Sequence, residues 1–426
     1  MQREGRRKGL FIILDGVGDR PSPELDGETP LERADTPNLD RLVSRGLGGM
    51  MDPLFPGVAV GTHVGTAILF GLPPAQARHL TRGPVEAAGI ELEPAPGDLL
   101  MRANLATVEP DGEGFVVRDR RAGRIEVGVE ELAACLSDID LGGGVTGRLH
   151  PATQHRMVLQ LSGGTFSADI SDTDPGGGAP RGRVLTSRPQ DLSDTLASAT
   201  ADAVNSFTRV ACERLADHPV NRQRIDMGLP PANGVICRSA GLMDSMVSLF
   251  NRFGVRAAVI AGESTVLGLG RMLGYAVHTD SRFNSLPTTD LEAKVEAASR
   301  LLEDHDLVFL HIKGPDICSH DHDPIGKARL LERVDAALTP LLPGDMVIAV
   351  TGDHSTDCGS GRHTGDPVPT ILFSPAGRRD GVDRYGETSC FSGGLGRLSG
   401  TSLVASVLDA MGFSDSFKPD HESLYF

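Results

Sequence analysis

The sequence lacks tryptophan, a long apolar run, a paired-cysteine motif and an excess of positive charge. No apolar run approaches the roughly 18 residues that a membrane-spanning helix needs, so the sequence predicts no membrane span. The formal net charge of -16 makes the backbone of a nucleic acid or an anionic membrane an unfavourable partner. A small oxyanion can still bind an acidic protein, provided that metal ions and a few arginines reverse the local sign. We therefore expect no nucleic-acid or membrane partner.

The six cysteines are scattered along the chain without a CxxC spacing, which is typical of reduced thiols in a cytoplasmic protein. A basic N-terminal segment leads into an apolar run at 10–14. Asp15 ends that run after five residues, which is too short for the apolar region of a signal peptide. The sequence therefore predicts a cytoplasmic location.

The 426 residues are enough for two domains, and the 52 glycines suit many tight turns between strands and helices. From residue 192 onward, strand-like apolar runs alternate with amphipathic helical segments, which is typical of a parallel sheet with crossover helices. Between about 76 and 190, the apolar residues instead alternate in the manner of half-exposed strands. The sequence predicts an α/β fold in which residues 1–75 and 191–426 form a mostly parallel sheet flanked by helices. A smaller α+β domain, residues 76–190, is inserted into it.

Acidic residues and histidines follow the strand-like runs. The carboxyl ends of parallel strands meet at one edge of a sheet, where α/β proteins bind ligands. Three such runs end in an aspartate, alone or with a histidine, and a Gly-rich loop adds one more histidine, which gives Asp15, Asp316, His320, Asp353, His354 and His363. Asp316 and His320 are four residues apart, so they share one face of a helical turn and can grip one cation.

Carboxylates and imidazoles without thiolates describe a two-metal site for Zn or Mn rather than a structural zinc site. Simpler explanations exist for the individual residues. Taken singly, Asp15 is better explained as a turn or helix-capping residue. Asp316 and His320 can equally lie on a solvated helix face.

Residues 57–74 form a Gly-rich stretch that opens a short apolar helix. A hydroxyl at a helix N-terminus lies where the backbone N–H groups and the macrodipole favour a phosphate or an alkoxide. Thr62 is therefore a candidate nucleophile. Taken alone, this threonine is better explained as a simple N-cap.

Several basic residues are candidates for substrate binding. The predicted insertion contains donors suited to a phosphate or a carboxylate, namely Arg120, Arg121, Arg124, His155 and Arg156. Lys313, at the end of a strand-like run, is a further candidate. For each residue of the insertion, a solvated strand face is an equally good explanation.

Together, these motifs resemble the archaeal-type cofactor-independent (2,3-bisphosphoglycerate-independent) phosphoglycerate mutases of the alkaline phosphatase superfamily. The resemblance runs along nearly the whole chain and rests on an ordered set of segments, among them 14–19, 82–84, 102–107, 119–124, 316–320, 351–356 and 363–369. It implies a phosphatase-like metal domain that is split in sequence by a substrate-binding domain.

The resemblance also implies two divalent metal ions, which would be Mn, Zn or Mg. One ion would be held by Asp316, His320 and His363. The other would be held by Asp15, Asp353, His354 and the hydroxyl of Thr62. The enzyme would interconvert 3-phosphoglycerate and 2-phosphoglycerate through a phosphothreonine at Thr62, with glycerate held by arginines of the inserted domain.

The nucleophile loop departs from the family pattern. It usually reads Gly-Ser-Asp-Thr-Ala-His, whereas this chain has Gly61-Thr-His-Val-Gly-Thr66. His63 thus replaces an acid, and Thr66 replaces a histidine. Three alternatives stay open: the same mechanism on a phosphonate or other phosphoglycerate analogue in a specialised pathway, a metal-dependent phosphatase, and a non-catalytic metal protein that binds a phosphorylated ligand.

Overall fold

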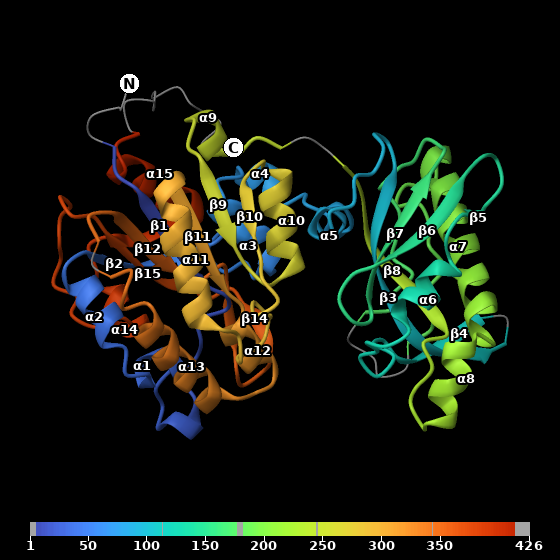
Figure 1. Cartoon of the computed structure of the whole chain (residues 1–426), viewed down its shortest axis with the longest axis horizontal. Coiled ribbons are helices and arrows are strands. Elements are labelled where there is room, and N and C mark those ends of the chain that lie inside the picture. Colours follow the sequence, from blue (N-terminus) through green and yellow to red (C-terminus); the bar gives the residue numbers. More distant parts are fainter. Residues whose placement is uncertain (1–5, 113, 177–181, 244–245, 343, 414–426) are drawn as a thin grey trace. The chain divides into compact units, whose positions relative to one another are not determined.

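The structure is a computed structural model that describes residues 6–112, 114–176, 182–243, 246–342 and 344–413. The chain divides into two compact units, the first formed by Met1–Leu80 and Met246–Phe426 and the second by Thr81–Ser245. In Figure 1 the first unit contains the blue N-terminal and the yellow-to-red C-terminal segments, and the second contains the cyan and green segments. The first unit is therefore discontinuous in sequence. Among the described residues, no helix is both long and apolar enough to cross a lipid bilayer.

The first unit is built on an eight-stranded sheet with the order β10-β9-β11-β1-β12-β15-β2-β16. All neighbours in this sheet are parallel except those of β15, which is antiparallel to β12 and β2. The predicted mostly parallel sheet is therefore confirmed. The strands are β1 (Gly9–Leu14), β2 (Leu47–Asp52), β9 (Ala257–Ile260), β10 (Ala276–His278), β11 (Leu307–Ile312), β12 (Val347–Thr351), β15 (Val368–Phe373) and β16 (Gly396–Ser399).

Helices connect these strands, and short polar residues fix where several of them begin. Asp290 and Asp323 cap α11 and α13 by accepting hydrogen bonds from Ala293 N and Gly326 N. The helices of this unit are α1 (Pro30–Arg33), α2 (Pro37–Ser44), α3 (Thr62–Leu69), α4 (Pro74–Ala77), α9 (Leu249–Arg252), α10 (Ser264–Met272), α11 (Leu291–Asp304), α12 (Gly314–His320), α13 (Pro324–Ala337), α14 (Glu387–Phe391) and α15 (Gly400–Ala410). A single 3-10 turn, Pro23–Leu25, and a hairpin of β13 (Ser355–Asp357) and β14 (Arg362–Thr364) complete the unit.

An aromatic cluster centred on Phe309 of β11 packs the core of the first unit. Its ring centroid lies 5.5 Å from that of Phe11, 4.5 Å from Phe70, 5.6 Å from Phe250 and 6.0 Å from Tyr275. Phe309 is completely buried. Because Phe70 directly follows α3, this packing ties the helix that begins at Thr62 to the central strands.

The second unit contains a six-stranded antiparallel sheet with the order β4-β3-β7-β6-β5, in which β8 pairs with the other side of β3. Its strands are β3 (Leu99–Asp111), β4 (Gly114–Asp119), β5 (Ile139–Asp140), β6 (Thr146–Pro151), β7 (Arg156–Ser162) and β8 (Gly234–Leu242). Its helices are α5 (Arg82–Gly89), α6 (Val129–Ala134), α7 (Thr195–Ala216) and α8 (Pro219–Asp226).

The second unit is longer than the sequence predicts. The expected boundary at residue 190 is replaced by one at Ser245, so that α7 and β8 belong to the second unit rather than to the larger one. The helix itself forms as expected, but its buried face, including Phe207 and Ala211, joins the hydrophobic core of the second unit. A periodic pattern shows that a helix has a buried face and does not show which core that face joins.

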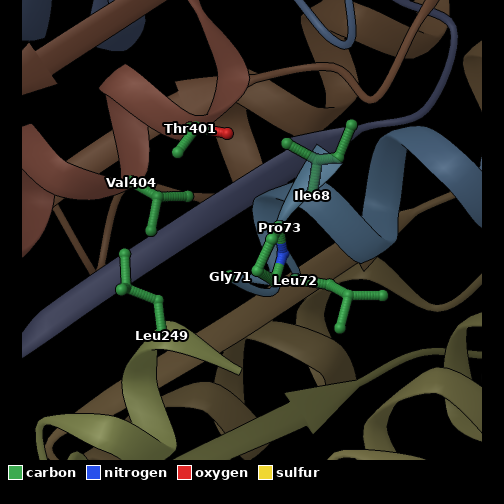
Figure 2. Close-up of a pocket in the computed structure, with 7 residues that line it drawn as sticks. All are labelled: Ile68, Gly71, Leu72, Pro73, Leu249, Thr401 and Val404. Carbon is green, nitrogen blue, oxygen red and sulfur yellow. The ribbon is translucent and has the colours of Figure 1, made fainter. Parts of the chain in front are cut away.

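A small cavity lies in the first unit, where α3, α9 and α15 meet (Figure 2). Apolar side chains such as Ile68, Leu249 and Val404 line it, together with Thr401, whose buried hydroxyl has no hydrogen-bond partner among the described residues. The cavity volume is about 10 Å³, which is the space of roughly one water molecule. It is too small for a metabolite, so it is not a candidate substrate site.

The aromatic cluster gives a stability prediction. Replacing Phe309 by alanine removes the ring at its centre, so Phe309→Ala should lower the free energy of unfolding by about 3–5 kcal/mol. Phe391→Ala is the matched control, because that ring is 70% exposed and its loss should change stability by less than about 0.5 kcal/mol. Urea denaturation followed by circular dichroism measures both, and equal effects would contradict the assigned core.

Candidate metal centre

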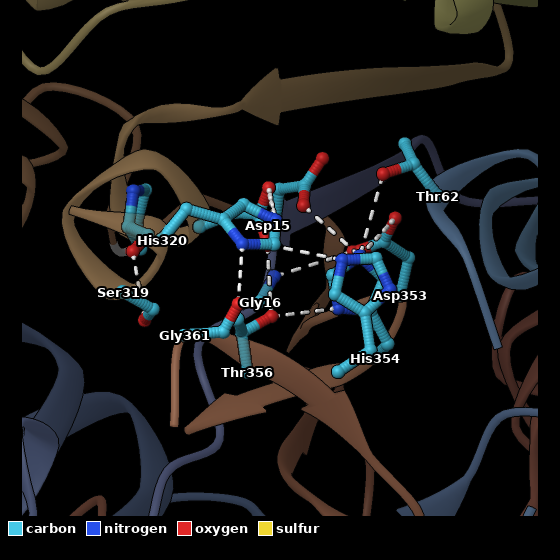
Figure 3. Close-up of polar contacts among 12 residues, drawn as sticks. Asp15, Gly16, Thr62, Ser319, His320, Asp353, His354, Thr356 and Gly361 are labelled. Carbon is cyan, nitrogen blue, oxygen red and sulfur yellow. Dashed lines mark hydrogen bonds and ion pairs between the residues drawn. The ribbon is translucent and has the colours of Figure 1, made fainter. Parts of the chain in front are cut away.

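The strand order brings the acidic strand ends together. β1 lies between β11 and β12, and all three run parallel, so their carboxyl ends lie side by side. Two groups of three residues result, Asp316 with His320 and His363, and Asp15 with Asp353 and His354. Figure 3 labels His320 of the first group and all three residues of the second. Within each group, the potential ligand atoms lie within 4.8 Å of one another. The structure thus assembles all six acidic and imidazole residues singled out from the sequence.

In the first group, both imidazoles present Nε2 to the same carboxylate. His320 Nε2 lies 3.4 Å from Asp316 Oδ2, and His363 Nε2 lies 3.5 Å from Asp316 Oδ1. The Nδ1 atoms are engaged elsewhere, with the carbonyl oxygens of Gly361 and Val60, each at 2.8 Å. A carbonyl oxygen only accepts, so each Nδ1 carries the hydrogen and each Nε2 is left to face the centre of the group.

The second group is oriented by Thr356. The hydroxyl of Thr356 donates to Asp316 Oδ1 at 2.8 Å and lies 3.0 Å from His354 Nδ1. Because a hydroxyl has one hydrogen and the carboxylate takes it, the hydroxyl accepts from Nδ1–H of His354. His354 Nε2 then faces Asp15 Oδ1 at 3.3 Å and Asp353 Oδ2 at 3.7 Å.

Thr62 and Lys313 join the two groups. The hydroxyl of Thr62 lies 3.3 Å from His354 Nε2 and accepts from Lys313 Nζ at 3.1 Å. Lys313 Nζ also donates to Asp15 Oδ1 at 3.1 Å and to Asp316 Oδ2 at 2.6 Å. Thr62 is the first residue of α3 and not its N-cap, which is Gly61, and no side chain caps this helix. The simpler explanation of Thr62 as an N-cap is therefore wrong.

Charge is unevenly distributed over the centre. Burial favours the neutral form of Asp15 and of Asp316, but the ammonium group of Lys313 and hydrogen bonds from neighbouring histidines together outweigh it and hold the pKa of both carboxyl groups below the usual range. Burial and the charge of Asp15 instead raise the pKa of Asp353. For His354, burial lowers the pKa, but the charges of Asp353 and Asp15 prevail and raise it to about 9.

The donor set fits divalent cations. The two groups offer three carboxylates and three imidazoles with no thiolate, a set suited to Mn or Zn. In this structure the cation that Asp15 and Asp316 share is the ammonium group of Lys313. The carboxylates that converge here are thus paired with a cation, as buried negative charges require.

Several supporting residues were not predicted from the sequence. Lys327 of α13 is completely buried and donates to Gly16 O at 2.8 Å, to Asp19 Oδ2 at 2.8 Å and to Thr356 O at 3.2 Å. It therefore joins the loop after β1 to strand β13, which follows β12 closely in the chain. A signal existed, because Lys327 precedes Leu330, Leu331 and Val334 at helical spacing and is, with Asp335, a charged residue on the buried face of the helix.

The altered nucleophile loop also contacts the centre. Thr66 donates from its hydroxyl to Asp353 Oδ2 at 3.1 Å. The helix packs closely here, because a Cβ on Gly65 would lie 1.9 Å from the carbonyl oxygen of Asp353. A second buried partner of the centre is His311, whose Nε2 lies 3.0 Å from Asp15 Oδ2.

The predicted substrate-binding residues of the insertion all lie in the second unit and have different environments. Arg120 is held by both oxygens of Asp174, with Nε at 3.0 Å from Oδ1. Arg121 and Arg124 are exposed, and Arg156 is half-buried. Burial and the charges of neighbouring arginines, first Arg156, lower the pKa of His155 to about 4.

Comparisons with known proteins also indicate a metalloenzyme. Residues 7–410 match the family model described as the Metalloenzyme superfamily. The 2,3-bisphosphoglycerate-independent phosphoglycerate mutase of Methanopyrus kandleri is 42% identical over 411 residues, which are 95% of this chain and 96% of that protein. A protein of the same name from Archaeoglobus fulgidus is 40% identical over 413 residues, 96% of this chain and 99% of that protein.

Two solved structures are similar over nearly the full length. A protein of Pyrococcus horikoshii has a TM-score of 0.82 and 33% identity, with 97% of this chain and 99% of that chain covered. The cofactor-independent phosphoglycerate mutase of Thermoplasma acidophilum has a TM-score of 0.67 and 33% identity, with 95% of this chain and 100% of that chain covered.

The buried ion pair of Lys327 gives the prediction for this site. Lys327→Met leaves the Asp19 carboxylate buried without its cation, so the free energy of unfolding should fall by about 3–5 kcal/mol. Arg329→Met, which removes an exposed cation from the same helix, should change it by less than about 0.5 kcal/mol. Urea denaturation tests both variants. An unchanged free energy of unfolding in Lys327→Met would show that the ion pair of Lys327 with Asp19 does not stabilise this part of the fold.

Proposed function

Since the chain belongs to the metalloenzyme superfamily and, within it, to the 2,3-bisphosphoglycerate-independent phosphoglycerate mutases, we propose that it interconverts 3-phosphoglycerate and 2-phosphoglycerate. It is then an isomerase that acts by phosphotransfer on a small phosphorylated carboxylic acid. The observation that carries the proposal is the position of the Thr62 hydroxyl, which is within 3.3 Å of His354 Nε2 and 3.1 Å of Lys313 Nζ. A nucleophile at this point adjoins the second group directly, and Lys313 links it to Asp316 of the first group.

We propose that the chain holds two divalent metal ions. Asp316, His320 and His363 would hold one ion, and Asp15, Asp353, His354 and Thr62 the other. Mn, Zn and Mg are the candidates, and the three imidazoles favour Mn or Zn over Mg. When bound, such ions acidify a coordinated hydroxyl and neutralise phosphoryl oxygens.

The residues of the chain would then divide the reaction between them. The Thr62 hydroxyl gives up its proton and its oxygen attacks phosphorus, so that a Thr62–phosphate bond forms, the bond from phosphorus to the substrate oxygen breaks, and that oxygen takes up a proton to give glycerate. In the second half, the other hydroxyl of glycerate loses its proton and attacks, a new bond from phosphorus to glycerate forms, the Thr62–phosphate bond breaks, and the Thr62 oxygen is reprotonated. Lys313 supplies positive charge next to the reacting oxygen and so stabilises the charge that develops there.

We further propose that the first unit is the metal-binding part of the enzyme and that the second unit binds substrate. Of the residues predicted for that role, Arg121, Arg124 and Arg156 remain candidates, with neutral His155 beside them. Arg120 stays a candidate too, since 28% of its side chain is exposed while it pairs with Asp174. A cytoplasmic location is also proposed, because the six cysteines form no disulfide.

A second candidate function is the same phosphotransfer on a phosphonate or other analogue of phosphoglycerate. The altered nucleophile loop favours it, because Thr66 bonds Asp353 where the family usually has a histidine. His63 stands next to the nucleophile in place of an acid.

The proposal is tested with the Mn-loaded protein and 3-phosphoglycerate, by following 2-phosphoglycerate and free phosphate over time. Thr62→Ala should lower the conversion rate by a factor on the order of 10⁴ or more, since alanine has no hydroxyl to attack phosphorus. Thr62→Ser, which keeps a hydroxyl, is the matched control and should retain substantial activity. Absence of conversion at full metal occupancy would favour the analogue, and release of phosphate alone would favour a phosphatase.

Metal content provides a separate prediction. The native protein should bind two Mn ions per chain, and Asp316→Asn should bind one, because only the first group loses its shared carboxylate. Asp321→Asn is the matched control, since that carboxylate is exposed at the end of the same helix. Elemental analysis of the purified proteins measures the stoichiometry. Removal of the metal with a chelator should abolish activity, and added Mn should restore it. Two Mn ions per chain in Asp316→Asn would contradict the assigned ligands.

A further inference from the structure

His311 lies against Asp15 of the metal centre, and the reaction steps given above assign it no role. Its side chain is completely buried, and its Nε2 lies 3.0 Å from Asp15 Oδ2. Because an ionised carboxylate can only accept, Nε2 carries the hydrogen and donates it to Asp15. The other ring nitrogen, Nδ1, is buried without a hydrogen-bond partner among the described residues. The imidazole therefore directs its hydrogen bonding at Asp15.

An imidazole is an unfavourable side chain at position 311 unless the bond to Asp15 has a purpose. Phe309 lies two residues earlier on β11, so it points to the same face of the sheet, and it is the centre of the aromatic cluster. An apolar side chain at 311 would extend that core. The imidazole instead leaves a buried polar atom without a partner, which costs stability.

The two oxygens of Asp15 have different partners. Oδ1 lies 3.1 Å from Lys313 Nζ and 3.3 Å from His354 Nε2, so it points to the place where the ligand atoms of the second group meet. Oδ2 is the oxygen that His311 holds. Rotation of the carboxylate about its bond to Cβ would turn Oδ1 away from that place. The hydrogen bond from His311 opposes this rotation.

The main chain at Asp15 is fixed by contacts that do not involve the imidazole. The N–H of Asp15 donates to the carbonyl oxygen of Ile312 at 3.0 Å. Gly16 has a φ of +64°, and a Cβ there would lie 2.6 Å from the hydroxyl oxygen of Thr356, so the chain has no room to shift. The freedom that is left is that of the Asp15 side chain, and His311 restricts it.

His311 is itself held firmly in place. In the parallel register of β1 with β11 it is the partner of Ile13, and Asp15 follows Ile13 by two residues. The side chains of His311 and Asp15 therefore leave the same face of the sheet. The carbonyl oxygen of His311 accepts from Nζ of Lys294, a buried lysine of α11, at 2.9 Å. A fixed donor of this kind can hold a carboxylate in one orientation.

The other two carboxylates of the centre are held in the same manner. The buried hydroxyl of Thr356 donates to Asp316 Oδ1 at 2.8 Å, and the buried hydroxyl of Thr66 donates to Asp353 Oδ2 at 3.1 Å. In each case the donor is a side chain outside the two groups of three residues. Hydrogen bonds of this kind orient the ligands of a metal ion, and their loss typically weakens metal binding 10- to 100-fold.

We propose that His311 is a positioning residue of the metal centre: its Nε2–H holds Oδ2 of Asp15 and so keeps Oδ1 directed at the second group of ligand atoms. The inference deepens the proposed function and rests on it for the identity of the cation. His311 acts through Asp15 and is not one of the proposed ligands. The site residues predicted from the sequence do not include it, because the spacing of an apolar strand does not show which carboxylate an imidazole meets.

Titration of Mn into the metal-free full-length protein, followed by calorimetry, tests the proposal without catalysis. The native protein should bind two ions. His311→Leu should raise the Kd of one ion by about 10- to 100-fold and affect the other much less, because Asp15 alone loses its donor. His311→Gln is the conservative variant. Its amide nitrogen can take the place of Nε2 and donate to Asp15, so both Kd values should stay close to those of the native protein.

His278→Leu is the matched control, because it removes a histidine of β10 in the same sheet whose ring contacts Phe283. Its two Kd values should not change. Native Kd values in His311→Leu would overturn the proposal. A loss of affinity in His311→Gln as large as in His311→Leu would also overturn it, because the ring would then act by its packing and not by its N–H group. A native protein that binds fewer than two Mn ions would overturn it as well.

If His311→Leu does not fold by circular dichroism, His311→Asn replaces it. The shorter amide ends near the position of Nδ1 and cannot reach Asp15 Oδ2, so the same rise in Kd is expected, and an unchanged Kd would overturn the proposal. A protein that binds two Mn ions with the expected dependence on His311, but does not convert 3-phosphoglycerate, would retain this role of His311 and lose the proposed mutase activity.

Discussion

The repulsion among carboxylates buried at the strand ends is the constraint on which the first unit depends. Asp15, Asp316 and Asp353 are brought together by the sheet order, and low-dielectric surroundings make their mutual repulsion large. Lys313 offsets it from within the centre, and Lys327 offsets the charge of Asp19 just outside it. As a result, each buried carboxylate of this centre and its surrounding loops lies close to a cationic group or to a hydrogen-bond donor.

The sequence predicted the strand ends well and the supporting contacts poorly. Asp15, Asp316 and Asp353 follow apolar runs, so their positions at one sheet edge follow from parallel strands alone. Lys327 and Thr356 act across long sequence separations, and their roles depend on which loops the fold brings together. The predicted domain boundary at residue 190 was wrong for the same reason. The apolar face of α7 is equally compatible with either core until β8 pairs with β3.

The two units bury an excess of charge of opposite sign, and each offsets it with a few groups of the other sign. The first buries an excess of carboxylates around one ammonium group, and the second buries an excess of guanidinium groups around Glu86 and Asp174. The clustering of Arg82, Arg102 and Arg238 could not be predicted from spacing, because these residues are far apart in sequence and become neighbours only through the packing of α5 and the register of β3 with β8. A net charge of -16 therefore conceals a largely buried cluster of arginines within the chain.

The single hydrogen of the Thr356 hydroxyl has a consequence for cooperativity. The hydroxyl donates this hydrogen to Asp316 of one ligand group, and its oxygen accepts a hydrogen bond from His354 of the other. A shift of either side chain therefore disturbs the hydrogen bond of the other, so the orientations of the two groups are coupled. By thermodynamic reciprocity, whatever order the first group imposes on the second, the second imposes equally on the first. The two groups thus form one hydrogen-bonded unit.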